Sequence, residues 1–300
     1  MLSRLASLVL VAELVGGAVM LLPSFAADPG GLYTVRKQVE EARITFSVQD
    51  RRGGPISGLT RDDIRVVNDG RAVSDITSFF SYENVPIRLT VLLDASDSMS
   101  RRFGDEREMA EVLLKNVVRP GLDEATVVSF ASKMRPMVSR VGFRDLKAEG
   151  PTALYDSIYE AMPQLSELST RPVRRIMILF SDGEDNWSEH NLEDAIAAAQ
   201  QADTAIYPIT AHSHRYEYVG DKILRQLAES TGGHAFFLRN FDKPQLVYDA
   251  IQAELRAHYV VGFRPALTQA GFHTLKISAR NAKLKVRSRT GYYVEPAIAP

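Results

Sequence analysis

The chain has 300 residues, of which 45% are hydrophobic and 24% are charged, and its formal net charge is −1 at pH 7. This length suits one α/β domain together with a smaller unit. A nearly neutral chain gives no argument for a nucleic-acid partner, which requires a basic face. The sequence contains no cysteine, which excludes disulfides, thiolate metal sites, cysteine nucleophiles and a lipidated N-terminal cysteine.

Residues 1–26 have the pattern of an export signal peptide. Arg4 supplies a short positive segment, residues 5–22 are largely apolar, and Ser24 and Ala26 are the small residues that a signal peptidase recognises. An uncleaved membrane anchor is the alternative, because an apolar run of this length nearly spans a bilayer. We expect cleavage after residue 26 or 27 and therefore an extracytoplasmic protein, in the periplasm or secreted.

Residues 27–34 are rich in Gly and Pro and are expected to form a linker. Residues 35–84 then predict a small N-terminal β unit. Apolar residues alternate over residues 43–48, and a second strand at residues 64–67 leads into the hairpin turn Asn68-Asp69-Gly70. A returning strand is expected at residues 73–80. This unit has too few apolar residues to bury a core alone.

From residue 85 onward, strands alternate with helices. Apolar runs at residues 87–93 and 176–180 are typical of strands buried on both faces. Further strands are expected at residues 125–131, 205–209, 234–238 and 259–263. Apolar residues recur at helical spacing over residues 106–118, 152–165, 192–199, 223–228 and 246–255. The alternation predicts a doubly wound, mostly parallel sheet with helices on both sides, over residues 85–264.

Residues 265–300 return to short strands, at residues 273–279, 284–289 and 292–294. We predict that this C-terminal β segment pairs with the N-terminal β unit, so that each covers an apolar face of the other. The expected fold class is therefore α/β, with a small accessory β unit formed by both ends of the chain.

Carboxylate and hydroxyl side chains follow the two most apolar strands. Asp94, Ser96 and Ser98 follow the strand at residues 87–93, Asp182 follows the strand at residues 176–180, and Thr152 opens the helix between them. Ligands of doubly wound folds bind beyond the carboxyl ends of the strands, so we expect these side chains to converge. An all-oxygen site suits Mg²⁺, Ca²⁺ or Mn²⁺. Mg²⁺ tends to retain water at part of its shell, where a partner carboxylate can bind instead.

The segments DASDSM, GPTALYD and FSDGEDN together resemble the metal-ion-dependent adhesion site of von Willebrand factor type A (vWA) domains. The DxSxS signature of that family corresponds to Asp94, Ser96 and Ser98, its threonine to Thr152 and its second aspartate to Asp182. The flanking segments GLTRDDIRVVNDGRAVSDITSF, HYVVGFRP and LKVRSRTGYY also resemble an exported vWA-related family that is expanded in acidobacteria. The resemblance implies a Rossmann-like vWA fold and a non-enzymatic binding module whose protein or peptide ligand supplies a carboxylate to the metal.

The sequence departs from the family pattern at Asp97, where glycine is common. Asp tolerates unusual backbone angles better than most residues, so we expect the loop to form. We expect the additional carboxylate to favour Ca²⁺ or to tighten metal binding. We also expect it to repel an acidic partner, with Arg101 and Arg102 offsetting part of its charge. Glu184 and Asp185 add negative charge on the other side of the site.

Two other functions are consistent with parts of the pattern. One is a scaffold whose metal is purely structural. The other is a phosphatase-like hydrolase, which needs an acid/base aspartate two residues after its nucleophilic aspartate, where this chain has Ser96. The sequence has neither a Gly-x-Ser-x-Gly elbow nor a phosphate loop. We expect no catalytic residues, no nucleic-acid partner, and membrane contact only if the N-terminal segment is uncleaved.

Overall fold

The computed structural model describes residues 41–81, 85–137, 147–166, 173–211, 218–238, 244–256, 258–266 and 269–294. The predicted export signal, the predicted linker and the first residues of the predicted N-terminal β unit lie outside the described residues. Within the described ranges, no helix is both long and apolar enough to span a bilayer.

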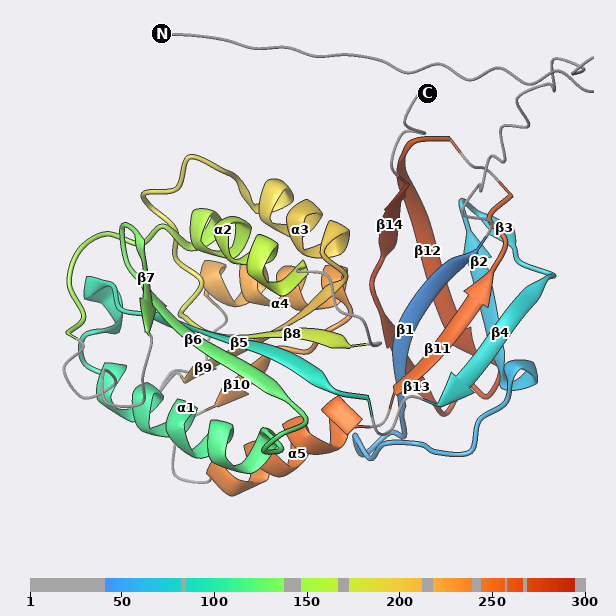
Figure 1. Ribbon diagram of the computed structural model, residues 1–300, viewed down its shortest axis with the longest axis horizontal. Helices are drawn as coiled ribbons and strands as arrows, with labels where there is room; N and C mark the ends of the chain where they lie inside the picture. Colours follow the sequence, from blue (N-terminus) through green and yellow to red (C-terminus); the bar gives the residue numbers. More distant parts are fainter. Residues whose placement is uncertain are drawn as a thin grey trace, which may run out of the picture. The chain divides into compact units, whose positions relative to one another are not determined.

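One six-stranded sheet forms the α/β region in the described part of the chain, with the strand order β10-β9-β8-β5-β6-β7 (Figure 1). Its strands are β5 (Ile87–Asp94), β6 (Glu124–Phe130), β7 (Met134–Met137), β8 (Arg174–Phe180), β9 (Thr204–Ala211) and β10 (Phe236–Leu238). All neighbours run parallel except β7, which pairs antiparallel with β6 at the edge. The doubly wound fold class is confirmed, and β7 is a strand that the sequence pattern did not predict.

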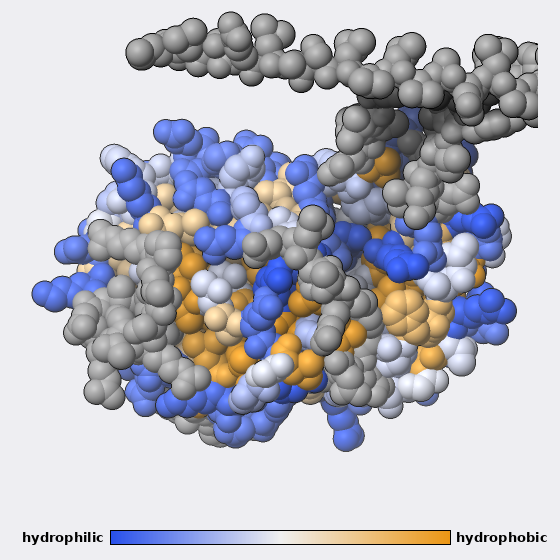
Figure 2. Space-filling view, in the orientation of Figure 1, coloured by the Kyte–Doolittle hydropathy of each residue, from blue (hydrophilic) through white to orange (hydrophobic). Residues whose placement is uncertain are grey.

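Helices cover both faces of this sheet (Figure 1). They are α1 (Phe103–Val117), α2 (Leu154–Ser166), α3 (Leu192–Gln201), α4 (Val219–Thr231) and α5 (Pro244–Arg256). Apolar residues of α1 and α5 pack on one face, and those of α2, α3 and α4 on the other. The outer surface of α2 and α3 is mainly hydrophilic in Figure 2, as expected for helices whose apolar stripe faces a sheet. Burial on both faces explains the apolar runs of β5 and β8.

Two details of the predicted elements have local explanations. Helix α4 ends at Thr231, and the following Gly232 adopts a left-handed conformation with φ of 85°. Pro208 lies inside β9, where a missing N–H would normally break a ladder. It aligns with Leu179 of β8, but the pairing with β10 begins only at Ile209. One side of β9 is therefore unpaired at Pro208, and proline is tolerated there.

The β region consists of two sheets in the described residues, with the orders β13-β1-β11-β4 and β14-β12-β2-β3. Its strands are β1 (Ala42–Gln49), β2 (Ile64–Asn68), β3 (Arg71–Ala72), β4 (Ile76–Ser81), β11 (His258–Phe263), β12 (Gly271–Ala279), β13 (Lys285–Ser288) and β14 (Gly291–Val294). Antiparallel pairing of β1 with β13 and of β2 with β12 joins the two ends of the chain, as predicted. Side chains from both sheets, including Phe46, Val66 and Ile277, share one apolar core.

Strand β11 lies in a different place from the one expected. The sequence predicted residues 259–263 as the last strand of the parallel sheet, but β11 pairs antiparallel with β1 and β4. Tyr259, Val261 and Phe263 face the core of the β region, whereas His258 and Val260 line a cavity toward the α/β region. This prediction was wrong because a strand buried on both faces has the same apolar pattern in either sheet.

Candidate metal centre

The carboxyl ends of β5 and β8 bring the predicted site residues to one edge of the parallel sheet. Asp94 is the last residue of β5, and a short 3₁₀ turn, η2 (Asp97–Met99), follows it. Asp94 and Ser96 are fully buried, whereas Ser98 is exposed. Asp182 lies two residues beyond the end of β8 and is 9% exposed. The site therefore has a buried carboxylate floor and one exposed hydroxyl.

Hydrogen bonds hold the Asp94 carboxylate in place between the two strands. One oxygen accepts the backbone N–H of Ser96 at 3.0 Å, and the other accepts the hydroxyl of Ser181 at 2.7 Å. The hydroxyl oxygens of Ser96 and Ser98 are 3.2 Å apart. Ser181, which the sequence analysis did not single out, thus links the end of β8 to the end of β5. Its signal was a hydroxyl directly before the candidate ligand Asp182.

Thr152 is buried immediately before α2, and backbone hydrogen bonds join it to the loop after β8. Its N–H donates to the side-chain oxygen of Asn186 at 2.8 Å, and its carbonyl accepts the N–H groups of Asn186 and Trp187, both at 3.0 Å. Asp185 accepts the N–H of Leu154 at 2.8 Å and so caps the first turn of α2. Asp185, expected to add negative charge to the site, orders the helix that follows Thr152.

The loop after β5 is tied to the segment that precedes Thr152. The N–H of Asp97 donates to the carbonyl of Gly150 at 3.0 Å, and the N–H of Glu149 donates to the carbonyl of Ala95 at 2.8 Å. Asp97 is exposed and does not need the left-handed conformation that favours glycine. Among the described non-glycine residues, only Asp69 and Asp203 have a positive φ. The departure from the family pattern at Asp97 therefore leaves the turn intact.

Asp182 is positioned by close backbone packing and by Arg102. One carboxylate oxygen accepts the N–H of Glu184 at 3.1 Å, and the other lies 3.6 Å from a terminal nitrogen of Arg102. A Cβ on Gly220, near the start of α4, would lie only 2.0 Å from the Asp182 carbonyl. Arg102 supplies part of the positive charge expected at this site, and it also donates to the carbonyl of Ala211.

The site buries acidic groups whose charged forms are poorly stabilised. Burial, together with the nearby charge of Asp182, raises the pKa of Asp94 to about 7. Burial also raises the pKa of Glu106 on α1 well above its usual value, although the charge of Arg102 opposes that shift. Glu106 is 1% exposed, and neither of its carboxylate oxygens has a hydrogen-bond partner among the described residues. A divalent cation at this edge would stabilise those charged forms, so the residues present fit a metal.

Carboxylates and imidazoles alone do not make this site. Within the described ranges, no three His, Asp or Glu side chains gather closely enough to hold a metal ion. A cation here would therefore depend on hydroxyl oxygens as well as on the two aspartates, which is the ligand set expected from the sequence. Glu106 was missed at the sequence level. Its signal was a carboxylate within the apolar stripe of α1, between Phe103 and Ala110.

Residues 89–250, more than half of the chain, match the model of the von Willebrand factor type A domain. The chain belongs to the vWA domain family. The vWA match begins within β5 and ends within α5, so it covers the sheet and the helices on both of its faces.

Solved structures with similar folds include three that differ in origin. A vWA protein from Catenulispora acidiphila has 13% sequence identity and a TM-score of 0.48, with 85% of this chain and 74% of that chain covered. Proximal thread matrix protein 1 from the mussel byssus, with a zinc-occupied MIDAS motif, has 18% identity and a TM-score of 0.47, over 61% of this chain and 49% of that chain. BatB from Bacteroides thetaiotaomicron has 15% identity and a TM-score of 0.44, over 56% of this chain and 98% of that chain.

These TM-scores are below 0.5, so the family assignment rests on the sequence match and agrees with the strand order. No curated protein shows significant similarity to the sequence.

Proposed function

We propose that this vWA domain binds one divalent cation and uses it to hold a carboxylate of a protein or peptide partner, without catalysing a reaction. Asp94 and Asp182 would neutralise the ion, and the hydroxyls of Ser96, Ser98 and Thr152 would complete the protein's share of the ligands. Oxygen ligands of this kind suit Mg²⁺, with Ca²⁺ and Mn²⁺ as the other candidates. A partner carboxylate would take a position that water otherwise fills.

The observation that carries this proposal is a pair of buried acids, at the end of β5 and on α1, whose charged forms the described residues leave poorly stabilised. Asp94 is fully buried, and Glu106 is buried with no hydrogen-bond partner among the described residues. Arg102 lies 3.6 Å from Asp182, and its positive charge offsets part of the negative charge of these acids. Buried charges are costly unless they are paired or coordinate a metal, so a bound cation explains why these acids lie together.

Exposure at the rim favours partner binding over a purely structural metal. Ser98 and its neighbour Asp97 are exposed, although Asp94, Ser96 and Thr152 are buried. A cation held by these residues would be reached from the side of Ser98. Trp187 follows the Asn186 that bonds Thr152, and it is 61% exposed. An exposed tryptophan beside the rim is the kind of side chain that anchors a partner.

We further propose an extracytoplasmic location, in the periplasm or secreted. This part of the proposal is supported by the export pattern of residues 1–26. A partner would then be a protein or peptide of the cell envelope or of the surroundings.

The test compares the wild type with Asp94→Ala and with the matched control Asp97→Asn, which alters the exposed neighbouring carboxylate. Each protein is unfolded with urea in EDTA and in Mg²⁺, Ca²⁺ or Mn²⁺. Cation at 100 times its Kd should raise the free energy of unfolding of the wild type and of Asp97→Asn by about 2.7 kcal/mol. Asp94→Ala should show no such gain. Equal stability of the wild type with EDTA and with all three cations would rule out the metal.

The use of the cation is tested by capture of proteins from a cell-envelope extract. The wild type and Asp97→Asn should retain the same partner in Mg²⁺ and lose it in EDTA, and Asp94→Ala should not retain it. If the cation stabilises the fold but the captured protein stays bound in EDTA, the metal is structural and the scaffold alternative is correct.

A further inference from the structure

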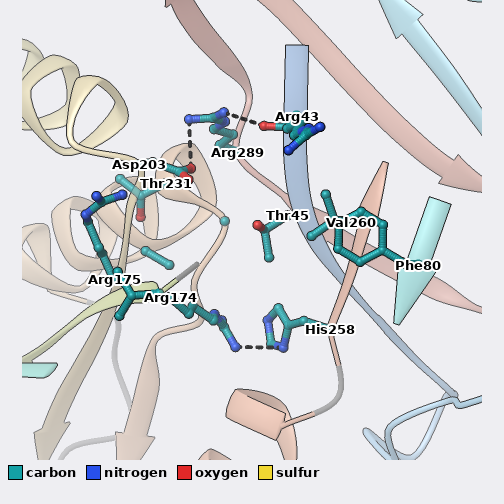
Figure 3. Close-up of a pocket in the computed structure, with 13 residues that line it drawn as sticks. Arg43, Thr45, Phe80, Arg174, Arg175, Asp203, Thr231, His258, Val260 and Arg289 are labelled. Carbon is teal, nitrogen blue, oxygen red and sulfur yellow. Dashed lines mark hydrogen bonds and ion pairs between the residues drawn. The ribbon is translucent and has the colours of Figure 1, made fainter. Parts of the chain in front are cut away.

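A cavity of about 250 Å³ lies at the amino ends of β8 and β9, where the α/β region meets β1 and β11 (Figure 3). Arg174 is the first residue of β8, and Asp182 follows the other end of the same strand. Residues 174 and 182 are therefore about 26 Å apart at the rise of a β-strand. The cavity is separate from the proposed metal site and lies at the opposite edge of the sheet.

Positive charge predominates in the walls of this cavity. The lining contains four arginines, Arg43, Arg174, Arg175 and Arg289, and a single carboxylate among its described residues, Asp203. Asp203 is already paired with Arg289 at 2.9 Å. Figure 3 shows the labelled arginines arranged around the open space. The walls therefore favour an anionic ligand.

His258 lines the cavity and carries a buried ring donor. Arg174 lies 2.7 Å from the Nδ1 atom of His258, and a guanidinium can only donate, so Nδ1 is the acceptor. Burial and the charge of Arg174 both lower the pKa of His258 well below its usual value, which keeps the ring neutral. The ring proton is therefore on Nε2. His258 is 2% exposed, and its Nε2 has no hydrogen-bond partner among the described residues.

Arg289 supplies a second buried donor in the same lining. Its terminal nitrogens bind Asp203 at 2.9 Å and the carbonyl of Arg43 at 3.2 Å. Its Nε has no partner in the described part of the chain. Figure 3 shows Arg289 and His258 on opposite sides of Thr45. A buried donor without a partner is destabilising, so a ligand acceptor atom would recover energy here.

The remaining wall is apolar and the space is small. Phe80, Val173 and Val260 contribute apolar side chains to the lining. A volume of about 250 Å³ corresponds to about eight water molecules at about 30 Å³ each. The space therefore suits a small molecule of about ten non-hydrogen atoms that combines an anionic group with an apolar body.

We propose that this cavity binds a small organic carboxylate. The carboxylate accepts the Nε2–H of His258 and lies in the positive field of Arg174, Arg175 and Arg289. The Nε–H of Arg289, in the same lining, is a second buried donor that a small shift of its side chain would bring to another acceptor atom of the ligand. The apolar body of the ligand contacts Val260 and Phe80. This carboxylate site belongs to the protein itself and is independent of the partner carboxylate proposed at the metal.

The test uses benzoate as the probe, benzamide as its uncharged isostere and inorganic phosphate as a purely polar anion. Binding to the full chain is measured by isothermal titration calorimetry at constant ionic strength in EDTA. The wild type and Asp94→Ala are both measured, so that binding of benzoate to a metal ion cannot contribute. We expect saturable benzoate binding in both proteins, with benzamide and inorganic phosphate each at least tenfold weaker. Benzamide or phosphate binding as tightly as benzoate would overturn the proposal.

Variants locate the binding site. Arg175→Gln should weaken benzoate binding about tenfold, and His258→Phe, which keeps the volume of the ring, should weaken it at least as much. Arg264→Gln, at an exposed arginine outside the cavity, should leave the affinity unchanged. In the wild type, benzoate should shift the proton resonance of the His258 Nε2–H. If His258→Phe does not fold, the affinity of Arg175→Gln and the His258 resonance of the wild type still show whether benzoate binds in this cavity. Unchanged affinity in Arg175→Gln with an unshifted resonance would place benzoate elsewhere and overturn the proposal.

Discussion

The two ends of the parallel sheet bury charges of opposite sign, and they satisfy those charges in different ways. At the amino end, the terminal nitrogens of Arg174 reach the carbonyl of Leu255 at 2.8 Å, His258 at 2.7 Å and the hydroxyl of Tyr207 at 2.6 Å. At the carboxyl end, Asp94 accepts hydrogen bonds from Ser96 and Ser181. Both carboxylate oxygens of Glu106 lack a partner among the described residues.

The difference shows at which end the fold itself stabilises the buried charge. Neutral carbonyl, hydroxyl and imidazole groups surround Arg174, so its charge is stabilised by the fold itself. At the other end the pKa values of both Asp94 and Glu106 are raised, because burial disfavours their charged forms. A cation from solution can stabilise those charged forms. Under the proposed function the acidic end therefore depends on a bound cation, whereas Arg174 at the basic end contributes to folding without a ligand.

The largest expected effect is the pH dependence of the metal-free protein at the acidic end. Folded Asp94 has a pKa of about 7, against 3.8 for its ordinary value, so the folded state keeps a proton that the unfolded state has lost. The free energy of unfolding should therefore fall as the pH rises from about 4 to about 7, by at most about 4 kcal/mol from Asp94. Urea unfolding in EDTA across this range measures the fall.

The variants for this experiment separate Asp94 from its neighbours. Asp94→Asn should reduce the fall, and Asp94→Asn combined with Glu106→Gln should reduce it further, because both folded pKa values are raised. Asp97→Asn should leave it unchanged, since Asp97 is exposed. Saturating Mg²⁺ should also reduce the pH dependence of the free energy of unfolding of the wild type. Identical profiles for the wild type and Asp94→Asn would contradict the view that the acidic end is uncompensated.

The next effect concerns the basic end. Arg174→Ala should lower the free energy of unfolding by about 3 kcal/mol, because it leaves the buried partners on Leu255, Tyr207 and His258 without their donor. The control is Arg264→Ala, at an exposed arginine that lies 3.9 Å from Asp75 and should cost less than about 0.5 kcal/mol. Urea unfolding at pH 7 measures both. A loss for Arg174→Ala as small as that of the control would mean that the basic end does not contribute to folding.

Much of the acidic end could be predicted from sequence because its signals are local. Asp94 and Asp182 each follow an apolar strand directly, and the topology of alternating strands and helices brings the ends of β5 and β8 together. Glu106 was harder to find, because a single carboxylate on a helix belongs to no recognisable motif. Its position in the apolar stripe of α1 was the one available signal.

The basic end could not be predicted in the same way. Arg174 and His258 are 84 residues apart, and nothing in the sequence near either residue indicates the other. Their contact also depends on the placement of β11, whose apolar pattern fits a parallel sheet and a β sandwich equally well. The structure places β11 beside β1 and β4, and the cavity follows from that placement.

The smallest expected effect concerns backbone packing at the acidic end, and two glycines form a matched pair. A Cβ on Gly220 would lie 2.0 Å from the Asp182 carbonyl, whereas a Cβ on Gly104 in α1 would meet no atom within 4 Å. Gly220→Ala should therefore lower the free energy of unfolding by about 2 kcal/mol, because the backbone of Asp182 or of α4 must move. Gly104→Ala should raise the free energy of unfolding by at most about 1 kcal/mol, because alanine favours the helix more than glycine does.

The same pair tests whether this packing serves the metal. Mg²⁺ titration followed by urea unfolding should show weaker binding in Gly220→Ala, because displacing the Asp182 backbone also displaces its carboxylate, and unchanged binding in Gly104→Ala. If Gly220→Ala lost stability but bound Mg²⁺ as tightly as the wild type, the close approach of α4 would support the fold alone. The position of Asp182 as a ligand would then depend on the Glu184 N–H and on Arg102 instead.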